Sequence, residues 1–225
     1  MTAGTEQKLS FPEKLVEFLQ RNRRTLAILL AVFVLGSAGL FGFFEYNSRR
    51  AEQALQKMEQ GLELYEELQV ADNAAQEELL AELQGILSDI RNNYSGTYAA
   101  ARAAFISAEL AWDRSDFEAA ADDFLSLAQR SPRSHLASRA LLLAGLAFEE
   151  VGNKEAARES YQKLVDDHGR EAPETPRALF ALGRLAEQGD DPDAARGYYE
   201  RLVQDFSGAA WTNLARNRII YFESQ

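Results

Sequence analysis

The sequence predicts an all-α protein, with an N-terminal transmembrane helix followed by a solenoid of stacked helical hairpins and a C-terminal capping helix. Three observations lead to this prediction. Residues 26–44 form one apolar run, three later segments share a residue pattern at steps of 37 and 38 residues, and a further helix-start pattern follows the third segment.

The apolar run is long enough to cross a membrane. No charged residue lies between Arg24 and Glu45, and about 20 apolar residues in helical form span the hydrocarbon layer. A cleaved secretory signal has a shorter apolar run of roughly 7–15 residues, whereas here apolar residues continue past the small residues at 36–38. We therefore expect an uncleaved anchor at residues 26–44 after a tail at 1–25, rather than a signal or the core helix of a soluble domain.

Flanking charge predicts the orientation of this anchor. Five Lys or Arg residues precede the run and three follow it closely, and the more positive flank tends to stay in the cytoplasm. We expect a cytoplasmic N-terminus and an exported C-terminal domain, that is, a single-pass protein of a bacterial inner membrane with its domain in the periplasm. Ala38 and Gly42 have the spacing of small residues that lets a second transmembrane helix approach, although such pairs are also common by chance.

Charge limits the partners of the exported domain. The first 44 residues hold 5 of the 24 Lys and Arg residues and 3 of the 35 Asp and Glu residues, which leaves the remainder at net charge -13. Such an acidic surface repels nucleic acid and anionic headgroups, so we expect protein partners and no nucleic acid. The chain has no cysteine, so disulfides and thiolate chemistry are excluded.

The repeated pattern combines small, aromatic and leucine positions. Each segment has an alanine, an aromatic residue four positions later, a leucine three positions after that, and a small residue twelve positions before the alanine. The sets are Ala120, Ala157 and Ala195; Phe124, Tyr161 and Tyr199; Leu127, Leu164 and Leu202; and Ala108, Gly145 and Gly183. Because helix backbones approach closely only at small side chains, the pattern indicates a repeated helical hairpin.

These offsets resemble the signature of the tetratricopeptide repeat (TPR) family. In the middle segment Gly145, Phe148, Gly152, Ala157 and Tyr161 match it. The resemblance implies units at about 101–134, 138–171 and 176–209, with a period lengthened beyond about 34 residues by long linkers.

The connections predict where helices begin. Ser95, Ser131, Thr175 and Ser207 precede alanine-rich segments and are predicted helix caps, with Pro132 and Pro176 at first helical positions. The last start predicts a capping helix at 209–222 within an array that covers 95–225. Apolar spacing at 45–94 predicts a juxtamembrane helix and a degenerate first hairpin.

The whole layout resembles the YfgM-like family of single-pass periplasmic TPR proteins, whose namesake is an ancillary subunit of the Sec translocon. The linkers are also similar to those of envelope-assembly TPR lipoproteins, but the chain lacks their lipid-bearing cysteine. The resemblance implies a membrane-anchored periplasmic scaffold that binds translocon subunits, periplasmic chaperones or exported clients. Alternatives are an envelope-assembly or cell-division scaffold and a regulatory subunit of a membrane enzyme.

Catalytic and metal-binding patterns are not apparent in the sequence. His135 and His168 lie in linkers without a metal-binding or nucleophile context. The acidic turn at 189–193 lacks the ligand spacing of a calcium loop, and Asp191 with Pro192 predicts a helix cap there instead. We expect no enzyme activity, no cofactor, no metal and no small-molecule substrate.

The TPR resemblance also implies a binding groove, lined by the first helix of each hairpin. Three arginines occupy the same position in the three units and form an arginine row, Arg102, Arg139 and Arg177. Their guanidinium fork suits a carboxylate or an acidic peptide. The alternative is that these arginines pair with acids of neighbouring units and only fix the stacking. The predicted groove residues are Arg102, Phe105, Ile106, Glu109, Trp112, Arg139, Leu142, Leu143, Leu146, Glu149, Arg177, Phe180, Arg184 and Glu187.

Overall fold

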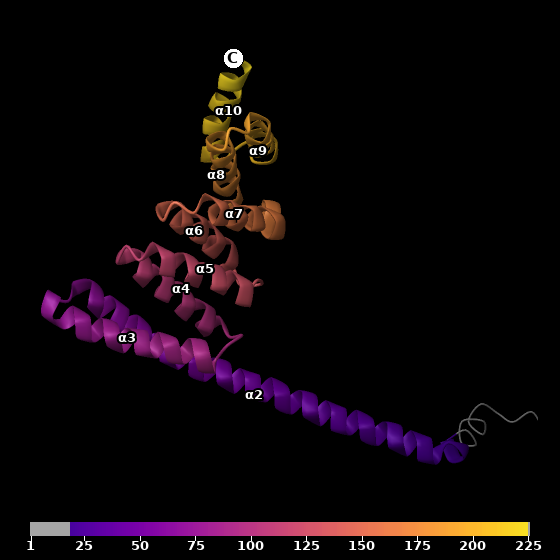
Figure 1. Cartoon of the computed structure of the whole chain (residues 1–225). Helices are drawn as coiled ribbons and strands as arrows, with labels where there is room; N and C mark the ends of the chain where they lie inside the picture. The colour runs from indigo at the N-terminus through magenta and orange to yellow at the C-terminus, as the bar shows by residue number, and fades with distance from the viewer. Residues whose placement is uncertain (1–18, 225) are drawn as a thin grey trace, which may run out of the picture. The chain divides into compact units, whose positions relative to one another are not determined.

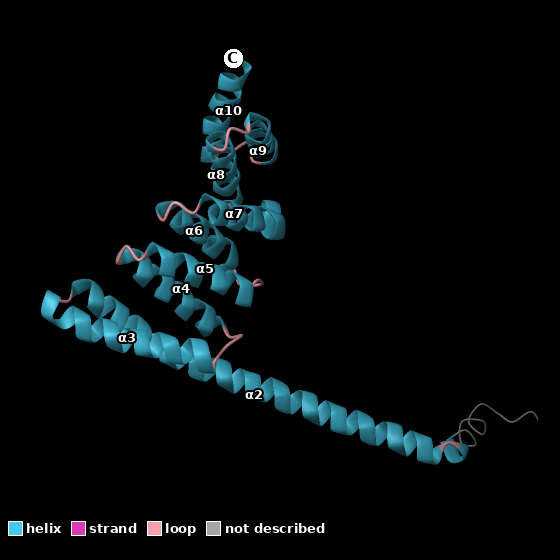
Figure 2. Cartoon of the chain, viewed as in Figure 1, coloured by secondary structure: helices cyan, strands magenta, loops and turns pink. Residues whose placement is uncertain are grey.

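The computed structural model of the protein describes residues 19–224, so most of the predicted tail at 1–25 lies outside the described residues. Within residues 19–224 every regular element is a helix and no strand occurs (Figures 1 and 2). The predicted all-α fold class is confirmed. The chain divides into two units, Met1–Arg50 and Ala51–Gln225.

The first unit contains the apolar part of helix α2 (Arg23–Val70). Its large side chains lack protein cover, and Phe33, Leu35 and Phe41 are 71–73% exposed. Among the described helices, α2 is the one whose length and apolar composition suffice to cross a membrane, and its most apolar window is 0% buried. A helix that is apolar on all sides is stable only in an apolar environment, such as a protein core or a membrane.

The second unit begins with a hairpin made by residues 51–70 of α2 and by α3 (Asn73–Asn93). Ala54 and Met58 of α2 are buried in one cluster with Leu83 and Leu87 of α3. This cluster extends into the next helix, so the hairpin forms the first layer of the array.

From α3 onward each helix packs against the next one along the chain, which is the arrangement of a solenoid of stacked hairpins. The last helix, α10 (Ala210–Glu223), also contacts α8 (Thr175–Gln188) and covers the end of the stack. The remaining elements are α4 (Tyr98–Asp113), α5 (Phe117–Arg130), α6 (Ala137–Glu150), α7 (Lys154–His168), the short 3-10 helix η1 (Gly169–Glu171) and α9 (Pro192–Asp205).

Glycine permits the closest helix contacts in the array. A Cβ atom on Gly145 of α6 would lie 2.3 Å from Cε1 of Tyr161 on α7, and one on Gly183 of α8 would lie 2.5 Å from Cε1 of Tyr199 on α9. Both tyrosines are at most 1% exposed. Each ring therefore fills the space that a side chain on the facing helix would occupy, and burial of each ring contributes roughly 1.5–3 kcal/mol.

The turn inside each repeat hairpin has one recurring conformation. Ser115, Gly152 and Asp190 have φ values of 60°, 76° and 55°. Each precedes an Asp or Asn residue whose side chain accepts a hydrogen bond from the backbone N–H three residues on, and these caps start α5, α7 and α9. The predicted cap at Asp191, with Pro192 behind it, is confirmed.

The predicted caps at the other helix starts are wrong. Thr97, not Ser95, caps α4 by accepting from the N–H of Ala100. The helix α6 begins at Ala137 without a side-chain cap, several residues after Ser131. At α8 and α10, buried threonines hold the helix start by donating to the carbonyls of the preceding connection, from Thr175 to Gly169 and from Thr212 to Phe206, both at 2.5 Å.

Candidate partner-binding groove

The predicted groove residues all lie on the first helices of the three hairpins, α4, α6 and α8. The solvent exposure of these residues differs. Phe105, Ile106 and Leu142 are at most 6% exposed, so they belong to the packed core of the array and support the helices from within. The half-buried or exposed members are Arg102, Glu109, Trp112, Arg139, Leu143, Leu146, Glu149, Arg177, Phe180, Arg184 and Glu187.

Two arginines of the predicted row lie over aromatic rings. The guanidinium carbon of Arg139 is 5.3 Å from the centroid of Phe105, and that of Arg177 is 5.7 Å from the centroid of Trp211. A guanidinium stacked on a ring is attracted by the ring face and keeps donors at its edge. Each arginine is thus held in place while its edge N–H groups remain suited to an oxyanion.

Glu109 lies near two arginines of the row. Burial raises the pKa of Glu109, and the charges of Arg139 and Arg102 partly oppose this effect. Tyr65 of α2 lies in the same electrostatic neighbourhood, where burial and the charge of Glu109 raise its pKa. Tyr65 belongs to no repeat unit and was not among the predicted groove residues.

A different arginine locks the second hairpin to the third. Arg184 of α8 donates to both carboxylate oxygens of Glu149 on α6, at 2.6 Å to Oε1. The phenol of Tyr161 donates to the same Oε1 at 2.7 Å. Burial and this hydrogen bond raise the pKa of Tyr161 far above its usual value.

The same arrangement recurs one unit later. Arg218 of α10 donates to both oxygens of Glu187, at 2.9 Å to Oε1, and Tyr199 donates to Glu187 at 2.7 Å. Burial pushes the pKa of Glu187 upward, but hydrogen bonds from Arg218 and Tyr199 outweigh burial and leave it below the ordinary value. These two networks fix the stacking between units.

Sequence reasoning missed the tyrosines and Arg218 as members of these networks. A signal was present, because a tyrosine follows each of the two glutamates by twelve residues. At the corresponding place in the first unit, Trp112 packs edge-on against Phe117 at 5.1 Å. The network of arginine, glutamate and tyrosine is therefore specific to the second and third units.

The lining residues of four hollows along the described part of the array include no member of the predicted groove set. Among residues 19–224, no group of three or more His, Cys, Asp or Glu side chains is arranged to hold a metal ion. On α2, Ala38 and Gly42 are exposed, and a Cβ on Gly42 would meet no atom within 4 Å.

Comparison with protein-family models gives two matches. Residues 17–157 match a tetratricopeptide repeat-like domain, and residues 142–210 match a tetratricopeptide repeat. The first match covers more than half of the chain and includes the apolar part of α2, the helices α3 to α6 and the first residues of α7. A search of curated proteins gives no match.

Proposed function

Because the chain belongs to the tetratricopeptide repeat-like family, we propose that it is a membrane-anchored scaffold that binds proteins at the periplasmic face of a bacterial inner membrane. We place it among the ancillary components of the translocon or of the chaperone network for exported proteins. TPR families are in general non-catalytic modules for protein interaction.

One observation carries this proposal. The family match runs without interruption from residue 17 to residue 157, through an exposed apolar helix and into the hairpins. A candidate membrane-spanning helix and an interaction array thus fall within one family match. An anchored groove acts by tethering, because confinement near the membrane raises the effective concentration of a partner there.

The arginine row supplies the recognition chemistry that we propose for the groove. The inter-hairpin ion pairs described above occupy Arg184 and Arg218, whereas Arg139 and Arg177 lie over rings. An acidic segment of a partner, placed along α4, α6 and α8, would pair with guanidinium edges that are already oriented. Prior orientation lowers the entropy that binding costs.

Photocrosslinking in intact cells tests the partner. A photoreactive amino acid at Leu143 or Leu146, both half-buried on α6, probes the groove, and one at the exposed Glu159 on α7 is the control. We expect translocon subunits, periplasmic chaperones or exported chains among the adducts from α6 and not from α7. Adducts restricted to envelope-assembly or division proteins would instead support the alternative scaffold role.

The absence of cysteine makes the orientation directly testable. A single cysteine at the exposed Glu200 should react with a membrane-impermeant thiol reagent in cells whose outer membrane is permeabilised. A cysteine at Ser10 should react only after the inner membrane is broken. The reverse result would place the array in the cytoplasm and overturn the periplasmic role.

A further inference from the structure

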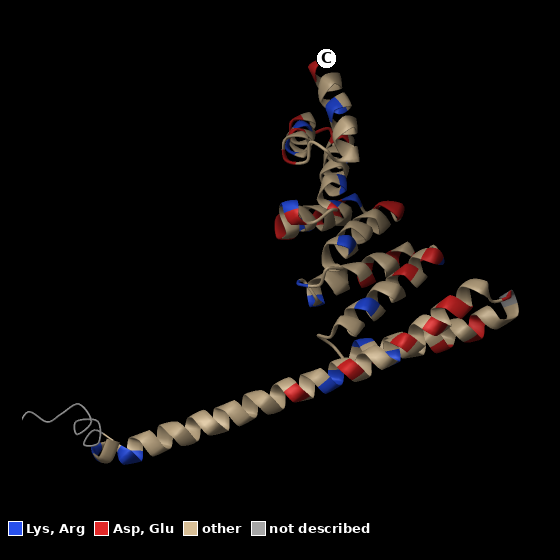
Figure 3. Ribbon diagram, turned by 180° about the vertical axis from the view of Figure 1, so that it is seen from behind, with Lys and Arg blue, Asp and Glu red and all other residues tan. Residues whose placement is uncertain are grey.

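Charge is unevenly distributed along the array. Acidic residues gather at the turns inside the hairpins, where α4 meets α5 and α6 meets α7, while basic residues gather at the connection between α5 and α6 (Figure 3). Arg130 is the last residue of α5, and the connection adds Arg133 and His135. In a chain of net charge -11, a local gathering of cations favours an anionic ligand.

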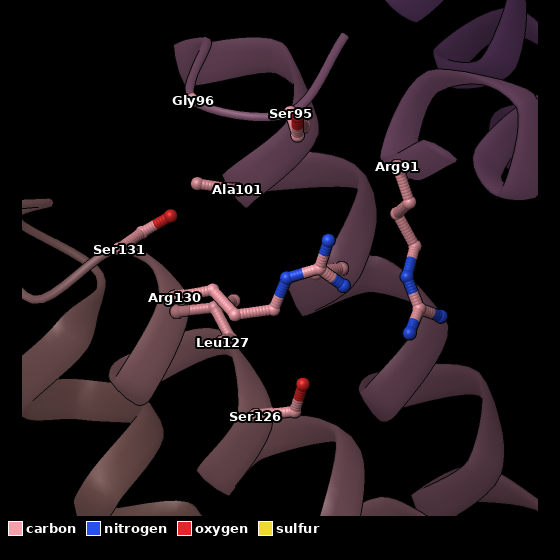
Figure 4. A pocket seen from close by; sticks show the side chains of 10 residues that line it. Arg91, Ser95, Gly96, Ala101, Ser126, Leu127, Arg130 and Ser131 are labelled. Atoms are coloured by element: carbon pink, nitrogen blue, oxygen red, sulfur yellow. The ribbon is translucent and has the colours of Figure 1, made fainter. Parts of the chain in front are cut away.

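A cavity of about 70 Å³ lies beside this connection, between α3, α4 and α5. Its floor consists of alanines at 100, 101 and 104 of α4, and their small side chains leave the space open. The guanidinium groups of Arg91 and Arg130 extend into the same space from different directions (Figure 4). Hydroxyl groups of three serines also line it, those of Ser95, Ser126 and Ser131.

The cavity continues into a wider cleft of about 440 Å³, with which it shares Gly96, Ala101, Arg130 and Ser131. Neither hollow has a carboxylate among its lining residues. Arg133 and His135 add basic groups to the cleft, and Tyr98 stacks on His135 with ring centroids 5.5 Å apart. A ligand held by Arg130 can therefore extend outward between basic and aromatic side chains.

The two arginines are differently engaged. Arg91 donates to Asp123 at 2.9 Å and is thereby positioned and partly neutralised. Arg130 is exposed and forms no ion pair within residues 19–224. One guanidinium is thus anchored, and the other retains its full charge for a ligand.

From this geometry we propose that the cavity binds a phosphate group, at a site separate from the groove on α4, α6 and α8. Two guanidinium groups and three hydroxyls make five donor groups, whereas a carboxylate has only about four acceptor sites on its two oxygens. A tetrahedral phosphate has more oxygens, directed to more sides, and can accept from a larger number of these groups. The wider cleft holds the rest of a phosphate-bearing molecule. This inference goes beyond the proposed scaffold role and does not depend on it.

Titration of the purified full-length chain in neutral detergent tests the site, by calorimetry with inorganic phosphate and, separately, with phosphatidylglycerol in mixed micelles. The variant Arg130→Ala removes the uncommitted guanidinium. The control Arg114→Ala removes the same charge from an exposed position at the α4–α5 turn. Circular dichroism melts confirm that both variants fold, and acetate serves as the carboxylate probe.

We expect saturable binding that Arg130→Ala weakens by at least about tenfold, since a hydrogen bond to a charged group accounts for about that factor or more, with little change in Arg114→Ala. Binding of inorganic phosphate identifies free phosphate as a sufficient ligand, and binding of the lipid alone identifies a lipid headgroup. No saturable binding, equal loss in both variants, or equal affinity for acetate would overturn the proposal.

Discussion

The ring of Tyr161 lies where a side chain on Gly145 would have to be, because a Cβ atom there would be 2.3 Å from Cε1 of the ring. Glycine at this position is therefore a packing requirement of the helix pair α6 and α7. The backbone of Gly145 is helical and has no positive φ, so the requirement is steric and not conformational.

We predict that Gly145→Ala destabilises the array by about 1–3 kcal/mol, because the added methyl forces the ring or the helix to move. The control Gly197→Ala lies in the exposed part of α9, where a Cβ meets nothing within 4 Å. There alanine should stabilise by about 0.5–1 kcal/mol. Urea denaturation followed by circular dichroism measures both, and equal effects of the two substitutions would contradict the packing argument.

Much of the fold could be predicted from the sequence, because the spacing of Gly145, Ala157 and Tyr161 reports a close helix crossing directly. The helix starts were harder. A serine or threonine before an alanine-rich segment resembles a helix cap. The hydroxyls of Thr175 and Thr212 instead donate to backbone carbonyls of the preceding connection. Which role a hydroxyl adopts depends on the path of the connection, and that path is set by packing.

The candidate site was less accessible to sequence reasoning. A repeated arginine position was evident, but a long guanidinium side chain can reach several carboxylates. The structure places Arg184 on Glu149 and places Arg139 over Phe105. The cavity between Arg91 and Arg130 joins residues from α3 and α5, and no periodicity relates these residues.

Removal of Glu149 should destabilise the array by about 1–3 kcal/mol, because the buried phenol of Tyr161 loses its acceptor and Arg184 loses its partner. Arg184→Ala should cost less than about 1 kcal/mol, since 37% of that side chain is exposed. Denaturation of the double variant, compared with the two single variants, gives the coupling energy between Glu149 and Arg184. The exposed pair Glu155 and Arg158 is the control. A coupling energy there as large as that between Glu149 and Arg184 would contradict the proposed role of Glu149 in joining the two hairpins.

Stability should fall as the pH rises above 10.0, the ordinary pKa of tyrosine. The folded state raises the pKa of Tyr161 and Tyr199 by burial and by hydrogen bonds to glutamates. Their protons are then lost from the unfolded chain first, so the stability that each contributes is complete below pH 10.0 and decreases above it. Each tyrosine adds a slope of about 1.4 kcal/mol per pH unit.

The variant Tyr161→Phe isolates this effect. Its stability at neutral pH should be lower because the hydrogen bond to Glu149 is gone. Above pH 10.0 its stability should decrease less steeply with pH, because one of the two tyrosines no longer contributes to the slope. Denaturant titrations at several pH values give the slope independently of the offset. An unchanged slope would mean that Tyr161 has the same pKa in the folded and unfolded chains.

Ser115 occupies the turn position that Gly152 occupies in the next hairpin, and both have positive φ. A residue with a side chain costs roughly 1–2 kcal/mol in this conformation, while glycine costs about 0.5–1 kcal/mol of additional entropy in folding. Ser115→Gly should therefore stabilise the array by about 0.5–1 kcal/mol, and Asp190→Gly should stabilise it less because Asp tolerates positive φ better.

The reverse change Gly152→Ala should destabilise the array, because a methyl group is introduced at a φ of 76°. Denaturation midpoints with an unchanged m-value test the series, and destabilisation by Ser115→Gly would show that its side chain stabilises the turn more than its backbone conformation costs.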